Sequence, residues 1–168
     1  HLDKALTFYR ENFEASVGYN VIKEDGLAGG KGVLVSSSIE KGEEFITQYF
    51  TKHCSSGSSG NEDGPRILIE KCLHGKEVSV LAFCNGNRAY LMPTARDFKR
   101  VYDGNKGPNT GGMGAFCPGN LLNPDQLMKI QRHMDNVVVN LGYVGVLYAG
   151  LMISDDGSIS FLEFNCRF

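Results

Sequence analysis

The stretch VLYAGLMISDDGSISFLEFN, from Val146 to Asn165, decides the fold of this chain. It contains two apolar runs of strand length, 146–154 and 158–165, joined by the acidic and glycine-containing turn at 155–157. Such a turn between two apolar runs is a strong signal for an antiparallel hairpin. We therefore predict two antiparallel strands in this part of the chain.

The second of these strands carries a candidate metal site. Glu163 and Asn165 lie two residues apart, so their side chains project from the same face of the strand. Magnesium binds a small number of hard oxygen ligands and keeps its other positions for water and substrate phosphates. Four apolar residues flank the pair: Phe161, Leu162, Phe164 and Phe168. They predict a mostly buried strand, in which an unpaired carboxylate is costly, and so favour a magnesium site over the alternative of a solvated strand face.

Hydrophobic periodicity upstream of the hairpin predicts an α+β chain. The expected elements are helices at 2–13, 40–50 and 124–141 and strands at 19–23, 33–36, 66–71, 77–84 and 88–92. The helix at 124–141 is the clearest, because Pro124 suits a first helical turn. The three strands between residues 66 and 92 are expected to form an antiparallel meander. The segment 103–120 is expected to be irregular because of its glycines, and 52–65 is expected to be a surface loop.

A candidate phosphate-binding loop lies in the hairpin between 19–23 and 33–36. Lys23 stands near the end of the first strand, and the tip contains Gly29, Gly30, Lys31 and Gly32. Glycines let backbone N–H groups approach phosphate oxygens, and the lysines supply positive charge. The alternative is a plain turn. The tip is not a Walker A loop, because Lys31 is followed by glycine rather than by Ser or Thr.

The segment after the strand at 66–71 is a candidate nucleoside-binding linker. Glu70 and Lys71 stand at the end of this strand, Leu73 follows it, and Glu77 begins the next one. An extended linker can contact an adenine through its backbone groups, and a nearby carboxylate can bind ribose hydroxyls. A surface turn is the alternative.

The segment GPNTGGMGA at 107–115 is a candidate cradle for a small anionic or zwitterionic ligand. It concentrates four glycines around polar donors and follows Lys99 and Arg100. Closely spaced backbone N–H groups of this kind can hold an anion. A flexible loop without a chemical role is the alternative.

The composition excludes several other classes of protein. The chain has 168 residues, 42% hydrophobic and 21% charged, which suits one compact domain or two small lobes sharing a cleft. A net charge of −2 without a basic patch argues against nucleic-acid partners, and no apolar run approaches the roughly 20 residues of a membrane helix. The five cysteines form no pair at metal-ligand spacing, so we expect reduced thiols in a cytoplasmic protein.

Five segments of the chain resemble, in the same order, those of the glycinamide ribonucleotide synthetases, a family of ATP-grasp ligases. They are VIKEDGLAGGKGV at 21–33, VSVLAF at 78–83, GPNTGGMGA at 107–115, VLYAGLM at 146–152 and LEFNCRF at 162–168. The resemblance covers nearly the whole chain. It implies an ATP-grasp fold with a small lid lobe at 1–70, a larger antiparallel-sheet lobe at 71–168, and nucleotide between them.

The resemblance also implies a reaction. Ligases of this family use ATP with Mg²⁺ or Mn²⁺ to join glycine to 5-phosphoribosylamine through glycyl phosphate, in purine biosynthesis. The implied partners are these small molecules, in some cases within a larger multifunctional purine enzyme. Two alternatives stay open: another ATP-grasp carboxylate–amine ligase, and a nucleotide-binding fragment or degenerate module without catalysis.

The family's functional residues match positions of this chain. By resemblance, ATP phosphates would be held by Lys23 and residues 29–32, adenine by Glu70, Lys71 and Leu73, and ribose by Glu77. Glu163 and Asn165 would bind the metal. The substrates would be bound by Asp97, Lys99, Arg100, Thr110, Gly111, Gly112, Met113, Gly114 and Arg167. Lys23 and Arg167 would be the catalytic residues.

The chain departs from the family pattern at several positions. Phe98 replaces a usual histidine, which leaves any substrate contact of that histidine in doubt. By resemblance, Leu151 stands where many other ATP-grasp enzymes place a further metal carboxylate, and the family is expected to share this difference. The chain begins at His1, without Met, and no acidic stretch follows LEFNCRF, so we expect a fragment that binds nucleotide weakly and does not turn over alone.

Overall fold

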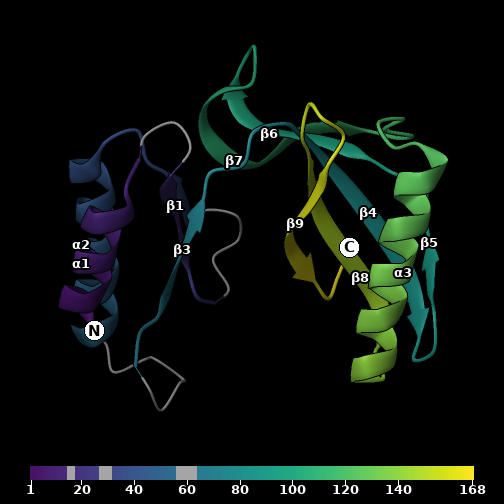
Figure 1. Ribbon diagram of the computed structural model, residues 1–168, viewed down its shortest axis with the longest axis horizontal. Helices are drawn as coiled ribbons and strands as arrows, with labels where there is room; N and C mark the ends of the chain where they lie inside the picture. Colours follow the sequence, from purple (N-terminus) through teal and green to yellow (C-terminus); the bar gives the residue numbers. More distant parts are fainter. Residues whose placement is uncertain (15–17, 27–31, 56–63) are drawn as a thin grey trace. The chain divides into compact units, whose positions relative to one another are not determined.

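The chain folds into two compact units, His1–Leu73 and His74–Phe168. The structure is a computed structural model that describes residues 1–14, 18–26, 32–55 and 64–168, and Figure 1 shows the elements of both units. The boundary between the units follows Leu73, whereas the expected division lay after residue 70. No helix among the described residues is long and apolar enough to cross a membrane.

Unit 1 packs two helices against a three-stranded antiparallel sheet. The helices are α1 (Leu2–Asn12) and α2 (Ile39–Ser55), and the strands are β1 (Tyr19–Glu24), β2 (Val33–Val35) and β3 (Ile67–Lys71), in the order β2-β1-β3. The buried core consists of Tyr9, Ile22, Ile46, Tyr49 and Phe50. The predicted hairpin of β1 and β2 is confirmed by their antiparallel pairing. This hairpin places Lys23 at the end of β1 that leads into the glycine-rich tip.

Unit 2 is built on a four-stranded antiparallel sheet with the order β5-β4-β8-β9. Its strands are β4 (Lys76–Asn85), β5 (Ala89–Leu91), β8 (Val144–Ile153) and β9 (Ile159–Asn165). Helix α3 (Pro124–Leu141) covers one face of this sheet (Figure 1), and its Ile130, Met134 and Val138 are buried in the core of the unit. The predicted hairpin at the end of the chain is confirmed by the β8–β9 pairing.

The predicted bounds of α3 are confirmed, and local sequence explains them. Asn123 accepts a hydrogen bond from the backbone N–H of Gln126, whose side chain accepts one from the backbone N–H of Asn123. This capping box satisfies N–H groups that the first helical turn leaves free. The helix ends at Gly142, which adopts the left-handed conformation with φ of 58°.

The expectation that 103–120 is irregular is wrong for most of the segment. Strands β6 (Arg96–Tyr102) and β7 (Lys106–Phe116) form an antiparallel ribbon in unit 2. The ladder passes directly from Phe98↔Gly114 to Arg100↔Asn109, so residues 110–113 form a bulge opposite Lys99. Glycines with positive φ can lie at bulges without preventing the pairing of the flanking residues. Gly112, with φ of 128°, lies in this bulge.

Two further expectations about the chain need correction. The meander between residues 66 and 92 forms only in part. The expected antiparallel pairing of β4 with β5 is confirmed, but β3 pairs with β1 in unit 1, and the other neighbour of β4 is β8. Helix α2 continues to Ser55, into the segment predicted as a loop at 52–65, of which 56–63 lie outside the described residues. Pairing partners distant in sequence leave no signal in local periodicity, which explains the first error.

Candidate functional site

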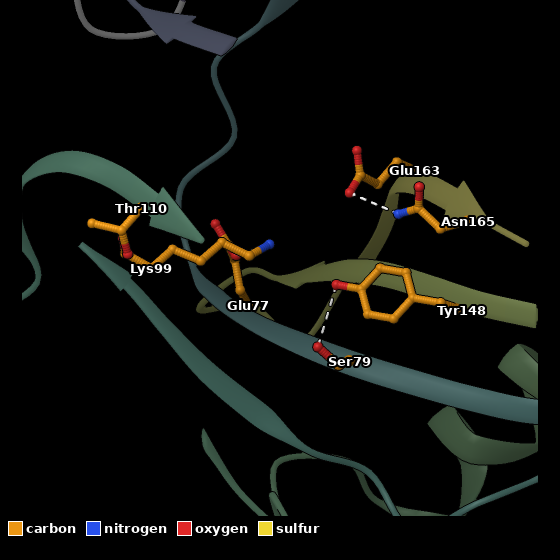
Figure 2. A network of polar contacts seen from close by, with 7 residues as sticks. All are labelled: Glu77, Ser79, Lys99, Thr110, Tyr148, Glu163 and Asn165. Atoms are coloured by element: carbon orange, nitrogen blue, oxygen red, sulfur yellow. Dashed lines mark hydrogen bonds and ion pairs between the residues drawn. The ribbon is translucent and has the colours of Figure 1, made fainter. Parts of the chain in front are cut away.

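The predicted metal pair lies on the face of the unit 2 sheet opposite α3. The Nδ2 of Asn165 donates a hydrogen bond to Oε1 of Glu163 at 3.1 Å, as Figure 2 shows. The amide oxygen of Asn165 and the second carboxylate oxygen of Glu163 stay available as acceptors. In the ladder with β8, Glu163 is opposite Gly150 and Asn165 is opposite Tyr148. The two side chains therefore offer two hard oxygen atoms side by side.

A bulge in β9 sets the direction of this pair. The register passes from Gly150↔Glu163 to Leu151↔Phe161, so Leu162 is the extra residue. As a result, Phe161 packs on the α3 side, 5.4 Å from the ring of His133, and stacks on Phe164. Without the extra residue, Phe161 would share a face with Glu163, because strand side chains alternate.

The burial argument for a metal at this pair is wrong. Glu163 is exposed, and Phe164 and Phe168 are 40% and 69% exposed. β9 is the last strand of its sheet, which is why the aromatic residues do not enclose it. The support for a metal site therefore comes from the paired oxygen atoms alone, and among the described residues no group of three or more His, Cys, Asp or Glu side chains forms a metal cluster.

The residue of β8 opposite Glu163 is Gly150. Leu151 is fully buried in the core of unit 2, on the α3 side of the sheet. A carboxylate at position 151 would therefore project away from Glu163. Gly150 is the residue whose added side chain would point toward Glu163.

Lys99 brings a positive charge to the same face. Its Nζ lies 3.4 Å from Oε2 of Glu77, and both side chains are partly exposed (Figure 2). Burial acts to lower the pKa of Lys99, but the groups of Tyr148, Glu77, Asp97 and Glu163 outweigh burial and raise it. The ammonium of Lys99 is thus held charged among several acidic groups of unit 2.

Tyr148 and Ser79 belong to this face and were missed from the sequence. The hydroxyl of Ser79 on β4 donates to the hydroxyl of Tyr148 on β8 at 3.3 Å (Figure 2). Strand alternation places Tyr148 and Gly150 on one face of β8, and the register of β8 with β9 places that face beside Glu163. The alternation was visible in the sequence, but the register was not.

The residues predicted to bind substrates, apart from Arg167, lie on the β6–β7 ribbon. Thr110 donates through Oγ1 to the carbonyl oxygen of Lys99 at 2.9 Å, which ties the bulge to β6 (Figure 2 draws both residues). Arg100 donates to the carbonyl oxygen of Gly107 at 2.7 Å. A Cβ atom added at Gly111, Gly112 or Gly114 would meet no atom within 4 Å, and Met113 is 59% exposed. The bulge is therefore an open backbone surface.

The unusual Phe98 belongs to a cluster of its own. The guanidinium of Arg96 lies 5.7 Å from the ring of Phe98 and 5.9 Å from the ring of Phe116, and the two rings are 6.0 Å apart. By strand alternation, Phe98 projects from the face of β6 opposite to Asp97 and Lys99. The substitution of histidine by phenylalanine therefore lies away from the Lys99–Glu77 pair.

Unit 1 contains the second group of predicted site residues. Nζ of Lys23 lies 2.7 Å from Oε2 of Glu70, so two residues assigned to nucleotide binding form an ion pair. Gly32 is buried, and its carbonyl oxygen accepts a hydrogen bond from the N–H of Glu24 at 2.8 Å. Gly29, Gly30 and Lys31 lie outside the described residues.

The remaining predicted residues lie near the ends of the two units. In unit 1, the Nζ of Lys71 lies 5.5 Å from the ring centre of Tyr19, and Leu73 is 38% exposed. In unit 2, Arg167 is exposed and donates to the carbonyl oxygen of Phe168 at 2.7 Å.

Comparison with known proteins relates the chain to one enzyme family. The family model described as phosphoribosylglycinamide synthetase, ATP-grasp (A) domain, matches residues 2–168. A phosphoribosylamine–glycine ligase of Leptospira interrogans is 44% identical over 154 residues, which are 88% of this chain and 35% of that protein. The chain thus spans about a third of the length of this relative.

Two further proteins extend the comparison. The trifunctional purine biosynthetic protein adenosine-3 of Bos taurus is 44% identical over 154 residues, which are 88% of this chain and 15% of that protein. The crystal structure of a phosphoribosylamine–glycine ligase from Thermotoga maritima matches with a TM-score of 0.78 at 36% identity. This match covers 98% of this chain and 41% of the Thermotoga chain.

Proposed function

The chain belongs to the phosphoribosylglycinamide synthetase ATP-grasp (A) domain family, and we propose that it is the nucleotide-binding part of a ligase that joins glycine to 5-phosphoribosylamine. ATP would be converted to ADP and phosphate, and the product would be glycinamide ribonucleotide, a purine precursor. The feature of the site that supports this function most directly is the Glu163–Asn165 oxygen pair with the Lys99 ammonium on the same sheet face. The relatives named phosphoribosylamine–glycine ligase give independent support.

Glu163 and Asn165 fit a divalent cation through their chemistry. Each keeps one oxygen acceptor after the hydrogen bond between them. Mg²⁺ accepts such an incomplete protein ligand set, because it retains water and phosphate oxygens in its other positions. When bound, Mg²⁺ or Mn²⁺ would neutralise negative charge on the ATP phosphates.

We assign ATP-binding roles to residues of each unit separately. In unit 1, which we propose as the lid of the ATP-grasp fold, Lys23 and the tip at 29–32 would hold phosphates, while Glu70, Lys71 and Leu73 would contact the adenine. In unit 2, Glu77 would bind the ribose hydroxyls. Lys23 and Glu77 are each paired with an oppositely charged side chain, Glu70 and Lys99 respectively. Binding would exchange these partly exposed ion pairs, which contribute little stability, for contacts with the nucleotide.

The reaction would proceed in two steps without a protein nucleophile. A carboxylate oxygen of glycine attacks the γ-phosphorus, the bond to the β-phosphate oxygen breaks, and ADP leaves. The amine of phosphoribosylamine then attacks the carbonyl carbon of glycyl phosphate, phosphate leaves, and the nitrogen loses a proton. The chain would contribute by orienting the reactants and by placing Lys23, Lys99 and Arg167 against developing negative charge.

The ribbon would bind the two substrates. Asp97, Lys99 and Arg100 offer both signs of charge, which suits zwitterionic glycine and the phosphate of phosphoribosylamine. At Gly111, Gly112 and Gly114 in and beside the bulge, an added Cβ atom would meet no atom within 4 Å, which leaves space for a substrate. The bovine relative is a trifunctional purine protein, so a chain of this family can be one segment of a multifunctional enzyme.

Calorimetric titration of the chain with ATP, in the presence and absence of Mg²⁺, tests this function. We expect Mg²⁺ to tighten ATP binding, and we expect a Glu163→Ala, Asn165→Ala double variant to lose this effect while keeping its far-ultraviolet circular dichroism. ATP binding by neither protein, with both folded, would contradict the proposal. Because the chain spans about a third of the length of its Leptospira relative, we expect that it does not form glycinamide ribonucleotide by itself, and product formation would contradict this expectation.

A further inference from the structure

The hydroxyl of Tyr148 has no role in the function proposed above, although it lies on the same sheet face as the metal pair. Tyr148 is opposite Leu81 in the ladder of β4 with β8 and opposite Asn165 in the ladder of β8 with β9. Its hydroxyl oxygen accepts a hydrogen bond from Ser79, which is only 8% exposed. Ser79 therefore fixes the phenol oxygen and does not use the phenol proton, which can be donated to a ligand.

A charged pair lies on the side to which this hydroxyl points. The ammonium of Lys99 is 3.4 Å from the carboxylate of Glu77, and Figure 2 shows both side chains at the hydroxyl end of Tyr148. Figure 2 shows the hydroxyl end of Tyr148 directed toward Glu77 and Lys99, while its ring lies beside Asn165. A neutral donor next to an ammonium suits an anionic oxygen atom, because the two groups together supply a hydrogen bond and a positive charge.

Gly150 keeps the space beside this hydroxyl open. A Cβ atom at position 150 would lie 3.3 Å from both the hydroxyl oxygen and Cε1 of Tyr148, and 3.5 Å from Cγ of Glu163. Any side chain at this position would therefore enter the space between the phenol and the carboxylate. The φ angle of Gly150 is not in the left-handed region, so backbone conformation does not require glycine there.

From this arrangement we propose that Tyr148 is a ligand-binding residue, whose hydroxyl donates a hydrogen bond to a phosphate oxygen that Lys99 also contacts. The identification of the ligand as the phosphate chain of ATP rests on the proposed function. Ser79 is a positioning residue, since it acts through Tyr148. Gly150 is required because it leaves room for the phosphate oxygen between the phenol and Glu163.

Three variants test this role in calorimetric titrations with Mg²⁺ and ATP. Tyr148→Phe removes only the hydroxyl, and we expect it to weaken ATP binding by about 10-fold or more, as for the loss of a hydrogen bond to a charged group. Gly150→Ala should also weaken ATP binding, because its methyl group occupies the same space. Tyr90→Phe is the matched control. Tyr90 lies on β5 and is 52% exposed, and the variant should bind ATP with the affinity of the unsubstituted chain.

Two spectroscopic measurements separate ligand contact from a purely structural role. In the unsubstituted chain carrying ¹³C-labelled tyrosine, the ring resonance of Tyr148 should shift on saturation with Mg²⁺ and ATP, and that of Tyr90 should not. Titration with Mn²⁺ alone, followed by electron paramagnetic resonance, should give the same affinity for Tyr148→Phe and the unsubstituted chain. Equal Mn²⁺ affinities are expected because we assign the phenol of Tyr148 to the phosphate and not to the metal.

The outcomes distinguish this inference from the proposed function. If the unsubstituted chain binds ATP with Mg²⁺ but Tyr148→Phe binds equally well and the Tyr148 resonance does not move, the inference is overturned and the proposed function stands. If the unsubstituted chain shows no magnesium-dependent ATP binding, the proposed function fails and the inference fails with it. If Tyr148→Phe does not fold, two other results test the inference. A shift of the Tyr148 resonance on ATP binding and weaker ATP binding by Gly150→Ala support it, and the absence of both overturns it.

Discussion

The ammonium of Lys99 lies 3.4 Å from the carboxylate of Glu77, although the two residues come from different sheets of unit 2. Glu77 begins β4, and Lys99 reaches it from β6 of the ribbon. Lys99 also interacts with Asp97 and Glu163, so one positive charge is shared among several acidic groups. Lys99 therefore acts as an internal counter-ion for the face that we propose to bind magnesium and ATP.

Replacing Lys99 by methionine should have opposite effects on the two ligands. Affinity for Mn²⁺ alone should rise by roughly three- to tenfold, because a positive charge near Glu163 is removed. Affinity for ATP should fall, because a phosphate contact is lost. Lys129→Met, on the exposed surface of α3, removes the same charge from a distant position and should change neither affinity. Equal Mn²⁺ affinities of Lys99→Met and the unsubstituted chain would refute the counter-ion role.

Changing Asn165 to aspartate should make the stability of unit 2 dependent on metal. Two carboxylates would replace the present hydrogen bond of 3.1 Å, and their repulsion should lower stability without metal by about 1 kcal/mol. Mg²⁺ should reverse this loss, because Glu163 and the new aspartate would hold the ion and it would neutralise their charge. Thermal unfolding with EDTA and with Mg²⁺ measures both effects, and equal melting temperatures of the variant in the two buffers would contradict them.

Phe98→His introduces the residue that the family resemblance leads us to expect here, and it should leave ATP affinity within about twofold. Phe98 projects from the face of β6 opposite to Lys99, so the new imidazole would not reach the Lys99–Glu77 pair. Stability should fall by about 1 kcal/mol or less through the weakened contacts with Arg96 and Phe116. Calorimetry and urea unfolding measure these two quantities. A large change in ATP affinity would show that this face of the ribbon also contacts the nucleotide.

Gly42→Ala should destabilise unit 1 by several kcal/mol. A Cβ atom at position 42 of α2 would overlap the ring and hydroxyl of Tyr9, which is fully buried between α1 and α2. Gly111→Ala is the control, since its Cβ would meet no atom within 4 Å. Urea unfolding followed by circular dichroism should show the loss only for position 42. Unchanged stability of Gly42→Ala would mean that α1 and α2 can separate freely.

Unit 1 should also lose stability at alkaline pH through Tyr9. Burial raises the pKa of Tyr9 above its ordinary value of about 10, and nearby Glu43 and Glu40 add to this effect. The contribution of the neutral phenol is therefore fully present below about pH 10 and is lost as the pH rises through the raised value. Urea unfolding at neutral and alkaline pH should show that Tyr9→Phe loses less stability at alkaline pH than the unsubstituted chain does. Tyr102 is 67% exposed, so Tyr102→Phe should lose as much stability at alkaline pH as the unsubstituted chain.

Sequence patterns predicted most of the elements but only part of the site. The helix at 124–141 and the two glycine-containing hairpins were predictable, because caps, turns and periodicity act over a few residues. Strand β6 was missed and β7 was taken as irregular, because their pairing depends on each other rather than on local propensity. Lys23 and Glu70 were each assigned to nucleotide binding, but their ion pair requires the β1–β3 register.

The sequence by itself determined that Glu163 and Asn165 share a face, because side chains two residues apart in a strand do so wherever the strand lies. It also determined the family, through segments that match over nearly the whole chain. Only the tertiary structure decided which other groups join that face. The extra residue at Leu162 turns the pair away from α3, and long-range pairing brings Lys99, Tyr148 and Ser79 to it. Such contacts depend on residues far apart in sequence, so local patterns do not encode them.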